Sequence, residues 1–509
     1  MTCISEEVPA MGAYHKGEAG AVFGLARTQF DAIEDFLCSE QAAAMSHAEL
    51  EERLQTDGRE LLRQLFQGHL ELRALREKRQ AVVVGSDGGV RTHVETSARG
   101  LMTVFGPVRV GRLAYRGRGM TALHPLDAAL NLPEEKQSHG LRRLAAEDAS
   151  LLSYDNALAL VRQQTGEETL AKRQTEELVV RAAQDFDAFY AQAVAAEPTN
   201  PRDLLALSSD GKGIVMRPEG LREATRQAAE QSQHKLEGRL SRGEKRNRKR
   251  MATVAAVYDV APYVRAPEDI LRDLRPARDP SPPRPRARNK RVWASVEKPA
   301  EVVTRELFDE AERRDPGHRR RWVVLVDGER HQIDRLRAEA RRRGIEAVLV
   351  LDLMHVLDYL WDAAWCFFEE GDRAAEAWVT EHALAILEGR SSSVAAGIRR
   401  SATLRGLRIK DRKGADDCAD YLIAKRDMLH YDEYLSEGLP IATGVVEGAC
   451  RHLINDRLDI TGARWTVAGA EAVLRLRAVR SSGDFEPYWR FHLQREYLRH
   501  HAARFAAAA

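Results

Sequence analysis

The strongest constraint in this sequence is an alternation of short apolar runs with helical segments between residues 292 and 352. The apolar runs read VWASVEK, RWVVLVD and EAVLVLD, which have the length and the β-branched content of buried strands. Helical periodicity separates them over Val302–Arg313 and over Gln332–Arg343. Two such strand-helix-strand alternations predict an α/β sheet with parallel strands and crossover helices.

The first 200 residues have a different texture. Apolar residues recur at helical spacing over Thr28–Leu75, where only Gly58 and Gly68 are possible breaks. Residues 81–125 are rich in Val, Thr and Gly, which predicts a small β module of three or four short strands. Helical periodicity then returns, and a turn cluster predicts a domain boundary at Glu197–Asp203.

Charge and cysteine content exclude several classes of protein. The chain carries 78 Lys and Arg residues against 77 Asp and Glu, so it is not a uniformly basic nucleic-acid coat, although local basic patches are possible. Five scattered cysteines without a CxxC pair support neither a disulfide framework nor a cysteine zinc site, and we expect no zinc. No apolar run is long enough to span a membrane, so we expect a cytoplasmic protein without a membrane partner.

Two basic runs interrupt the second half of the chain. Residues 234–250 hold eight Lys and Arg residues and two Glu, and residues 281–291 hold five positive charges and no acid. Neither run can build a core. Both are expected either to contact a nucleic-acid backbone without sequence preference or to be solvated, disordered segments.

Three acidic residues stand where an α/β sheet binds ligands. Asp210 ends the run ALSSD, Asp327 ends WVVLVD, and Glu447 begins a helix-like stretch, GVVEGACRHLINDRL. Converging carboxylates suit Mg²⁺, and two such ions would stabilise the attacking and leaving oxygens of a phosphoryl transfer. An Asp-Gly pair after a strand is also a simple turn signal, so both interpretations of Asp210 and Asp327 stay open.

A family resemblance gives these residues a context. The runs DLMHVLDYLW (352–361) and YDEYLSEGLPIATGVVEGACRHLINDRLDITGARWTVAGAEAVLRLRAVR (431–480) resemble the ISKra type of bacterial insertion-sequence transposase. The similarity extends through SSDGKGIVMRP, KRMATVAAVYDVAP, RWVVLVDGERHQ and PLDAALNLP, from about residue 80 to 500. It implies a DDE transposase with an RNase H-like catalytic domain, which uses Mg²⁺ (or Mn²⁺) to cut transposon ends and join them to target DNA.

The resemblance also assigns roles to single residues. It implies that Asp210, Asp327 and Glu447 are the catalytic acids and the metal ligands. A D-x-x-H element, matched by Asp352 and His355, follows the second acid, and Asp352 competes with Asp327 for the second-acid role. His355 either packs beneath the site or orients a phosphate.

Arginines flank Glu447 and could bind DNA phosphates. Arg451 lies one helical turn after Glu447, where it could pair with that carboxylate or with a phosphate. Further arginines extend this expected cationic surface, unless they form a solvated face with local ion pairs; they are Arg457, Arg464, Arg475 and Arg477. Trp361, Trp365 and Trp465 are expected in the core rather than stacked on bases.

Residues 153–184 have the pattern of a helix-turn-helix. Ser153 is a good N-cap, Gly166 marks a turn, and Lys172 and Arg173 lie near the front of the second helix, where DNA would be contacted. Short helix pairs also occur in bundles that bind no DNA. The apolar helical tract 353–435 predicts a packed insertion beside the active site, and joining two ends requires a dimer or higher oligomer.

The expected architecture is an α/β RNase H-like catalytic domain with an all-α insertion, preceded by an α+β N-terminal region containing the helix-turn-helix. Two other functions stay open, an RNase H-like nuclease without strand transfer and a non-enzymatic DNA-binding regulator. The expected segments are an N-terminal helical segment (1–80), the β module (81–125), the helix-turn-helix region (126–200), the catalytic core (201–355 and 440–485), the insertion (356–439) and a C-terminal helix (486–509).

Overall fold

The computed structural model divides into two compact units. Unit 1 comprises residues 1–185 and 486–509, and unit 2 comprises residues 186–485. The structure describes residues 20, 22–166, 170–195, 197–232, 235–236, 240–241, 244–273, 284–460 and 462–506. No helix in these ranges is both long enough and apolar enough to cross a membrane.

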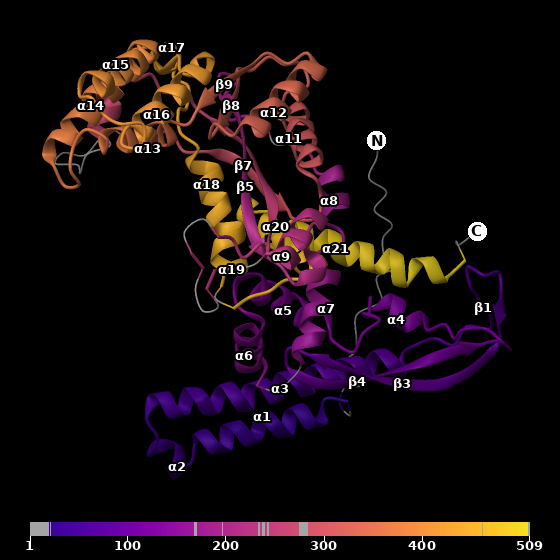
Figure 1. Cartoon of the computed structure of the whole chain (residues 1–509). Coiled ribbons are helices and arrows are strands. Elements are labelled where there is room, and N and C mark those ends of the chain that lie inside the picture. Colours follow the sequence, from indigo (N-terminus) through magenta and orange to yellow (C-terminus); the bar gives the residue numbers. More distant parts are fainter. Residues whose placement is uncertain are drawn as a thin grey trace. The chain divides into compact units, whose positions relative to one another are not determined.

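Unit 1 combines a helical hairpin, a β-hairpin and a cluster of helices (Figure 1). The helices α1 and α3 are in contact, and α3 packs on the strand β4. The core beneath contains Leu70 of α3 together with Leu101, Val108 and Val110 of the β-hairpin. The elements are α1 (Gly24–Leu37), α2 (Glu40–Ala43), α3 (His47–Leu75), β1 (Val83–Val84), β2 (Val90–Arg91), β3 (His93–Thr103), β4 (Gly106–Arg116), α4 (Pro125–Ala129), α5 (His139–Leu151), α6 (Tyr154–Thr165), α7 (Lys172–Ala182), α21 (Phe485–His500) and a 3₁₀ turn η4 (Ala502–Arg504).

The breaks in the N-terminal helical segment differ from the expected ones. The helix α3 runs through Gly58 and Gly68 without interruption, and the breaks fall instead at the N-caps Ser39 and Ser46. Gly68 serves a close approach, because a Cβ there would lie 2.7 Å from the carbonyl oxygen of Val22. The β module also differs, since β3 and β4 are eleven residues long each and only β1 and β2 are short.

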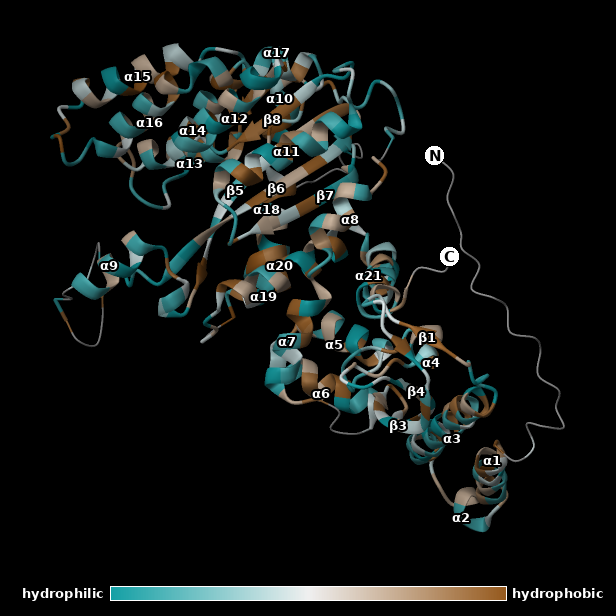
Figure 2. Cartoon of the chain, turned by 90° about the vertical axis from the view of Figure 1, so that its right-hand side faces the viewer, coloured by the Kyte–Doolittle hydropathy of each residue, from teal (hydrophilic) through white to brown (hydrophobic). Residues whose placement is uncertain are grey.

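Unit 2 is built on a five-stranded mixed sheet in the order β7-β6-β5-β8-β9. The strands β5, β6 and β7 pair antiparallel, whereas β8 pairs parallel to both β5 and β9. The predicted parallel strands are therefore confirmed. All five residues of β8 are buried, and Figure 2 shows the hydrophobic colour of the central strands next to helices that mix hydrophilic and hydrophobic residues. The strands are β5 (Leu204–Val215), β6 (Lys249–Val260), β7 (Arg288–Ser295), β8 (Trp322–Val326) and β9 (Ala347–Leu351).

Helices flank this sheet and form a separate group at one end of unit 2. The helices α13 to α17 occupy the segment where the sequence predicts an all-α insertion, and no described residue between β9 and α18 lies in a strand (Figure 1). The helices are α8 (Phe186–Gln192), α9 (Glu223–Gln231), α10 (Pro267–Asp273), α11 (Ala300–Arg314), α12 (Arg330–Arg343), α13 (Leu353–Ala364), α14 (Arg373–Leu387), α15 (Ser391–Leu404), α16 (Lys413–Ala424), α17 (Tyr431–Ser436), α18 (Gly444–Cys450), α19 (Asp456–Leu458) and α20 (Val467–Ser482).

The division between the units lies before the expected boundary at Glu197–Asp203. The helix α8 belongs to unit 2, where the Tyr190 hydroxyl donates to Asp484 over 2.8 Å and the guanidinium of Arg291 covers the Tyr190 ring. Most of the C-terminal helix α21 belongs to unit 1 rather than standing alone. Within unit 1 its Glu496 forms a buried ion pair of 2.9 Å with Arg142 of α5.

Candidate functional site: acidic residues at the sheet edge

Asp210 lies within β5 and not at its end. The parallel pairing of β5 with β8 stops at Ser208, but β5 continues to Val215 by antiparallel pairing with β6, which places Asp210 opposite Val254. The turn interpretation of Asp210-Gly211 is therefore wrong, because the partner strand β6 holds this segment extended. Asp210 stands where β5 has lost its neighbour on the β8 side, so its carboxylate faces an open edge of the sheet.

A buried cysteine contacts Asp210 from the helix α18. The thiol of Cys450 donates to Asp210 Oδ2 over 3.0 Å, and the backbone N–H of Gly211 donates to Oδ1. Burial and the charge of Asp210 raise the pKa of the Cys450 thiol, so the sulfur remains a protonated donor at neutral pH. This hydrogen bond joins the first expected acid to the helix that carries Glu447.

Asp327 follows β8 at a tight turn. Gly328 has a φ of +101°, a conformation that favours glycine, and the N–H of Glu329 donates to Asp327 Oδ1 over 2.8 Å. The turn predicted here is thus confirmed. Burial raises the pKa of Asp327, and the negative charge of Asp210 raises it further. The carboxyls of Asp210 and Asp327 are therefore close enough to interact electrostatically.

The Tyr421 hydroxyl of the helical insertion secures the same turn. It donates to the carbonyl oxygen of Asp327 over 3.0 Å, and the Tyr421 ring stacks on Tyr359 with centroids 3.9 Å apart. A Cβ on Gly328 would lie 2.5 Å from the Tyr421 hydroxyl oxygen. The insertion thus supports the turn that presents Asp327.

Asp352 follows β9 and is fully buried at the N-cap of α13. Its Oδ2 accepts hydrogen bonds from the backbone N–H of His355 over 3.1 Å and from the ring Nδ1 over 2.7 Å, and its Oδ1 accepts from the N–H of Thr443 over 2.8 Å. Both carboxylate oxygens are therefore committed to holding α13 and the segment before α18 in place.

Glu447 is exposed on α18, close to the buried Asp352 and the half-buried His355. The Thr443 hydroxyl donates to Glu447 Oε1 over 2.7 Å. One ligand atom each from Asp352, His355 and Glu447 lies within 4.8 Å of the others, a separation that a shared metal ion can bridge. The hydrogen bond to Asp352 raises the pKa of His355, and the charges of Asp352, Asp327 and Glu447 add to this effect.

These contacts bring all the sequence-predicted acids to one edge of the sheet. Asp210 is linked to Glu447 through α18, and the charges of Asp327 and Glu447 both reach His355. A cavity of about 530 Å³ adjoins Asp210 and Asp327, and Arg222 and Arg335 are among its lining residues. Carboxylate oxygens are the ligands that Mg²⁺ and Mn²⁺ prefer. Among the described residues, the ligand atoms that lie within 4.8 Å of one another are those of Asp352, His355 and Glu447, and neither Asp210 nor Asp327 belongs to that group.

The arginines that follow Glu447 divide into exposed and buried residues. Arg451 and Arg464 are exposed, and the Arg451 guanidinium lies 3.6 Å from Asp456 rather than against Glu447, because the chain turns into a π-helix at Arg451–Asn455. Arg457 is 2% exposed and covers the buried ring of Trp465. Its assignment as a DNA contact is therefore wrong.

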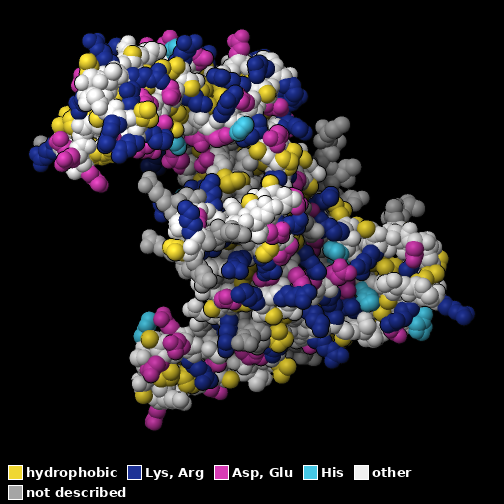
Figure 3. Space-filling view, viewed as in Figure 1, with side chains coloured by type: hydrophobic (Ala, Val, Ile, Leu, Met, Phe, Trp, Pro, Cys, Tyr) yellow, Lys and Arg dark blue, Asp and Glu magenta, His cyan; other side chains and the backbone are white. Residues whose placement is uncertain are grey.

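Two further arginines of this group also serve the fold. The Arg477 guanidinium is buried and donates to the carbonyl oxygen of Leu453 over 3.1 Å. Arg475 lies 3.2 Å from Asp187 of α8. The expected cationic surface therefore retains Arg451 and Arg464. In Figure 3, Lys and Arg side chains are interspersed with Asp and Glu over the visible face.

The three tryptophans that were expected in the core differ in their exposure to solvent. Trp465 is 5% exposed and buried as expected. Trp365 is 42% exposed and stacks on Trp361 with centroids 5.3 Å apart, so the expectation of a core position for Trp365 is wrong. The helical insertion thus presents an aromatic surface that the apolar pattern alone did not reveal.

The predicted helix-turn-helix residues lie in unit 1 at the start of α7. Gly166 has a φ of +79° and ends α6, whereas residues 167–169 of the predicted turn lie outside the described residues. Lys172 pairs with Asp155 of α6 over 2.8 Å, and Arg173 is 89% exposed. Thr175 is buried, so it supports the helix pair rather than its outer face.

The two basic runs lie only partly within the described residues, which omit 233–234, 237–239, 242–243 and 274–283. At the end of the second run, Arg291 belongs to β7 and forms an ion pair with the buried Glu310. An external DNA contact for Arg291 is therefore wrong, because the strand β7 extends further toward the run than the apolar pattern indicates.

Sequence reasoning missed three residues that hold the acids in place, namely Cys450, Thr443 and Tyr421. Thr443 lies four residues before Glu447 and Cys450 lies three residues after it. On a helix, this spacing places all three side chains on neighbouring positions, so the sequence could have indicated them. Tyr421 had no such signal. Comparisons with family models, with curated proteins and with solved structures find no match for this chain.

Proposed function

We propose that this chain is a DDE transposase that cuts and joins DNA at the ends of a bacterial insertion sequence. One observation carries the proposal. Asp210 and Asp327, more than a hundred residues apart in sequence, line one cavity that also includes arginines in its lining, and Glu447 lies on the helix whose Cys450 donates a hydrogen bond to Asp210. The order of three antiparallel strands followed by two parallel ones supports an RNase H-like core.

In this proposal Asp210, Asp327 and Glu447 hold Mg²⁺ or Mn²⁺. Such ions would stabilise the attacking and leaving oxygens of an in-line phosphoryl transfer. Cys450 and Thr443 act as positioning residues, since each donates a hydrogen bond to one of the acids. Arg222 and Arg335 would bind DNA phosphates in the cavity, where a guanidinium can make two parallel hydrogen bonds to one phosphate.

The roles of Asp327 and Asp352 follow from their different surroundings. Asp352 is buried with both oxygens bonded to backbone or to His355, which suits a positioning residue. Asp327 lines the cavity, which suits a metal ligand. The proximity of Asp352, His355 and Glu447 supports the alternative, in which Asp352 is the second acid.

The decisive experiment compares two glutamate variants in a cleavage assay with Mg²⁺ and DNA from the flanks of the gene. Glu447→Gln should abolish cleavage and leave DNA binding intact, because only a charged ligand is lost. Glu437→Gln is a matched control, since Glu437 is a surface residue paired with Arg321. Cleavage by the Glu447→Gln protein at the unmodified rate would refute the proposal.

The same assay separates the two alternative functions. A joined product between an end and target DNA indicates a transposase, and cleavage without joining indicates a nuclease. A DNA-binding regulator would bind the DNA with the same affinity with or without Mg²⁺ and would release no cleaved strand.

We infer a cytoplasmic protein that associates with the nucleoid when bound to DNA, and that forms a dimer or higher oligomer on paired ends because each end needs an active site. Light scattering with and without end DNA tests the assembly, and a complex with one chain per two ends would contradict it.

A further inference from the structure

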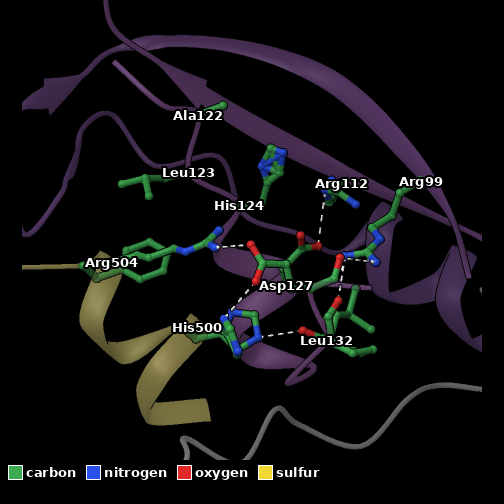
Figure 4. Close-up of a pocket in the computed structure, with 13 residues that line it drawn as sticks. Arg99, Arg112, Ala122, Leu123, His124, Asp127, Leu132, His500 and Arg504 are labelled. Carbon is green, nitrogen blue, oxygen red and sulfur yellow. Dashed lines mark hydrogen bonds and ion pairs between the residues drawn. The ribbon is translucent and has the colours of Figure 1, made fainter. Parts of the chain in front are cut away.

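Unit 1 contains a pocket of about 160 Å³ that is unusually rich in cationic side chains (Figure 4). The β-hairpin β3–β4, the helix α4, the segment 130–134 and the end of α21 with η4 form its walls. All lining residues belong to unit 1. The volume corresponds to about five water molecules at roughly 30 Å³ each, so the pocket can hold one small ligand group.

Two arginines project from the same face of the β-hairpin into this pocket. Arg112 of β4 is opposite Ser97, and Arg99 of β3 lies two residues further along, so the two arginines are diagonal neighbours on one face. Arg99 donates to the carbonyl oxygens of Pro133 over 2.9 Å and of Glu134 over 3.3 Å. These acceptors fix the guanidinium in position but do not neutralise its charge.

Arg112 supplies the strongest sign of a missing ligand. Its side chain is only 11% exposed, and its Nε lies 3.3 Å from Asp127 Oδ1 of α4. Among the described residues, no hydrogen bond reaches the buried atoms Nε and Nη1 of Arg112. Nε faces the Asp127 carboxylate in an ion pair, whereas the buried Nη1 has no acceptor, which costs free energy, so this end of the guanidinium is prepared for an acceptor that enters the pocket.

The remaining charged groups leave the pocket positive. Arg504 and His500 both contact Glu134, at 3.2 Å and 3.3 Å, so one carboxylate serves two basic side chains. Among the lining residues, three arginines face two acids, Asp127 and Glu134, and the charge of Glu77, which does not line the pocket, also acts on Arg112. Burial lowers the pKa of His124 to about 4, and the surrounding arginines lower it too, which reports the positive potential at its ring.

We propose that this pocket binds a phosphate group, with Arg112 as the principal ligand and Arg99 as the second. The planar guanidinium fork matches the tetrahedral oxygens of phosphate, and burial strengthens a charge-assisted hydrogen bond. The phosphate belongs either to a DNA backbone or to a small free molecule. The proposal does not depend on the catalytic role of unit 2, since every residue that carries it lies in unit 1.

The first test measures binding of inorganic phosphate to the full chain by calorimetry at constant ionic strength. Arg112→Gln should weaken phosphate binding about tenfold or more, and Arg99→Gln should weaken it to a smaller extent. Arg109→Gln is the matched control, because Arg109 is exposed on the same strand but on the opposite face. Equal affinity in the Arg112→Gln and Arg109→Gln proteins would overturn the proposal.

A second measurement covers the case in which Arg112→Gln fails to fold. Selective labelling of histidines in the unmodified chain allows the pKa of His124 to be followed by NMR. Phosphate in the pocket should raise this pKa above its value of about 4, because the anion offsets the arginine charges. A His124 pKa that is the same with saturating phosphate and with chloride would overturn the proposal.

Short duplex DNA distinguishes the two sources of the phosphate. If saturating DNA displaces inorganic phosphate from the unmodified chain, and Arg99→Gln weakens DNA binding, the ligand is a backbone phosphate. If DNA leaves phosphate binding unchanged, the pocket takes a small free molecule. Both results support a phosphate site. Because both experiments measure binding, their outcome does not depend on whether unit 2 cleaves DNA.

Discussion

The sheet edge of unit 2 and the pocket of unit 1 concentrate charges of opposite sign. At the sheet edge, Asp327 and Asp352 are held near the carboxylates of Asp210 and Glu447, whereas in the pocket Arg99 and Arg112 project from one face of a hairpin. The hydrogen bond to Asp352 raises the pKa of His355 and the nearby carboxylates add to this effect, whereas burial lowers the pKa of His124 and the nearby arginines lower it further.

This difference shows that each unit holds like charges together at a site where a ligand of the opposite charge can bind. Like charges held together in a partly buried place destabilise the protein, and the cost is relieved when a counter-ion binds. The sheet edge therefore suits a cation and the pocket suits an anion.

Asp210→Asn should reduce DNA cleavage at least about a hundredfold, because the sheet edge would lose one charged ligand of the metal. The midpoint of thermal unfolding should not fall, since the amide keeps the shape of the carboxyl and removes repulsion with Asp327. A strand-cleavage assay and a melting curve measure both effects. Cys450→Ser retains a donor to Asp210 and should reduce cleavage much less.

Asp352→Asn should lower the free energy of unfolding by about 1–3 kcal/mol, because a buried acceptor of backbone and His355 hydrogen bonds becomes an amide. Asp327→Asn should instead raise it at neutral pH. Urea unfolding measures the two changes. If Asp327→Asn lowered the free energy of unfolding and Asp352→Asn raised it, Asp327 would be the positioning residue and Asp352 the metal ligand.

The pH dependence of the Asp327 effect follows from its raised pKa. Because the folded state binds the Asp327 proton more tightly than the unfolded state does, protonation of Asp327 stabilises the fold. This stabilisation is complete below the ordinary pKa of 3.8 and is lost as the pH rises through the raised pKa of the folded state. The stabilisation by Asp327→Asn relative to the unmodified chain should therefore grow with pH across this interval. Urea unfolding at several pH values provides the measurement.

Arg457→Gln should destabilise unit 2 by about 1–2 kcal/mol, since it removes a buried guanidinium that covers Trp465. Arg464→Gln is the matched control, because Arg464 is exposed in the same segment. It should leave stability unchanged and weaken DNA binding. A gel-shift titration and urea unfolding measure the two effects. If Arg457→Gln weakened DNA binding without lowering stability, the structural role of Arg457 would be contradicted.

Histidine NMR should sharpen the contrast between the two charged regions. The protonated form of His355 stabilises the fold below pH 6.5, and this contribution is lost as the pH rises through the raised folded-state pKa. For His124 the sign is reversed, and stability falls as the pH drops from 6.5 to about 4. Mg²⁺ should lower the pKa of His355, and a pKa that does not respond to Mg²⁺ would argue against a metal at this edge.

The smallest expected effect concerns the start of α7. Replacing Lys172 and Arg173 by Ala should change stability by less than about 0.5 kcal/mol, because both side chains are exposed. Each lost phosphate contact should reduce the salt dependence of binding to end DNA by roughly one unit of slope. Arg53→Ala is a control in the same unit, since Arg53 is exposed and pairs with Asp57 of its own helix. Unchanged salt dependence in gel shifts would refute DNA binding by α7.

The sequence predicted much of the sheet, and the reasons are local. The runs that became β8 and β9 are apolar throughout, because parallel strands are covered on both faces. The turn after Asp327 was predictable from Asp-Gly, whereas the same pair at Asp210 forms no turn, since pairing with β6 overrides the local preference.

Other features depend on contacts between distant segments. Arg477 was expected at the surface by its residue type, but its buried guanidinium donates to the carbonyl oxygen of Leu453, 24 residues earlier. The support of Asp327 by Tyr421 spans 94 residues, and no local pattern encodes it. The pocket around Arg112 likewise requires the β-hairpin and the end of α21 to meet.

The return of α21 to unit 1 has a consequence for biosynthesis. Arg142 and Asp185 are made early, but their buried partners Glu496 and His492 leave the ribosome only after the whole of unit 2. Domains generally fold as they emerge during synthesis, so unit 2 can fold while the interior of unit 1 still lacks its last helix. A released chain that ends at residue 485 should therefore contain a protease-resistant unit 2 and a protease-sensitive unit 1.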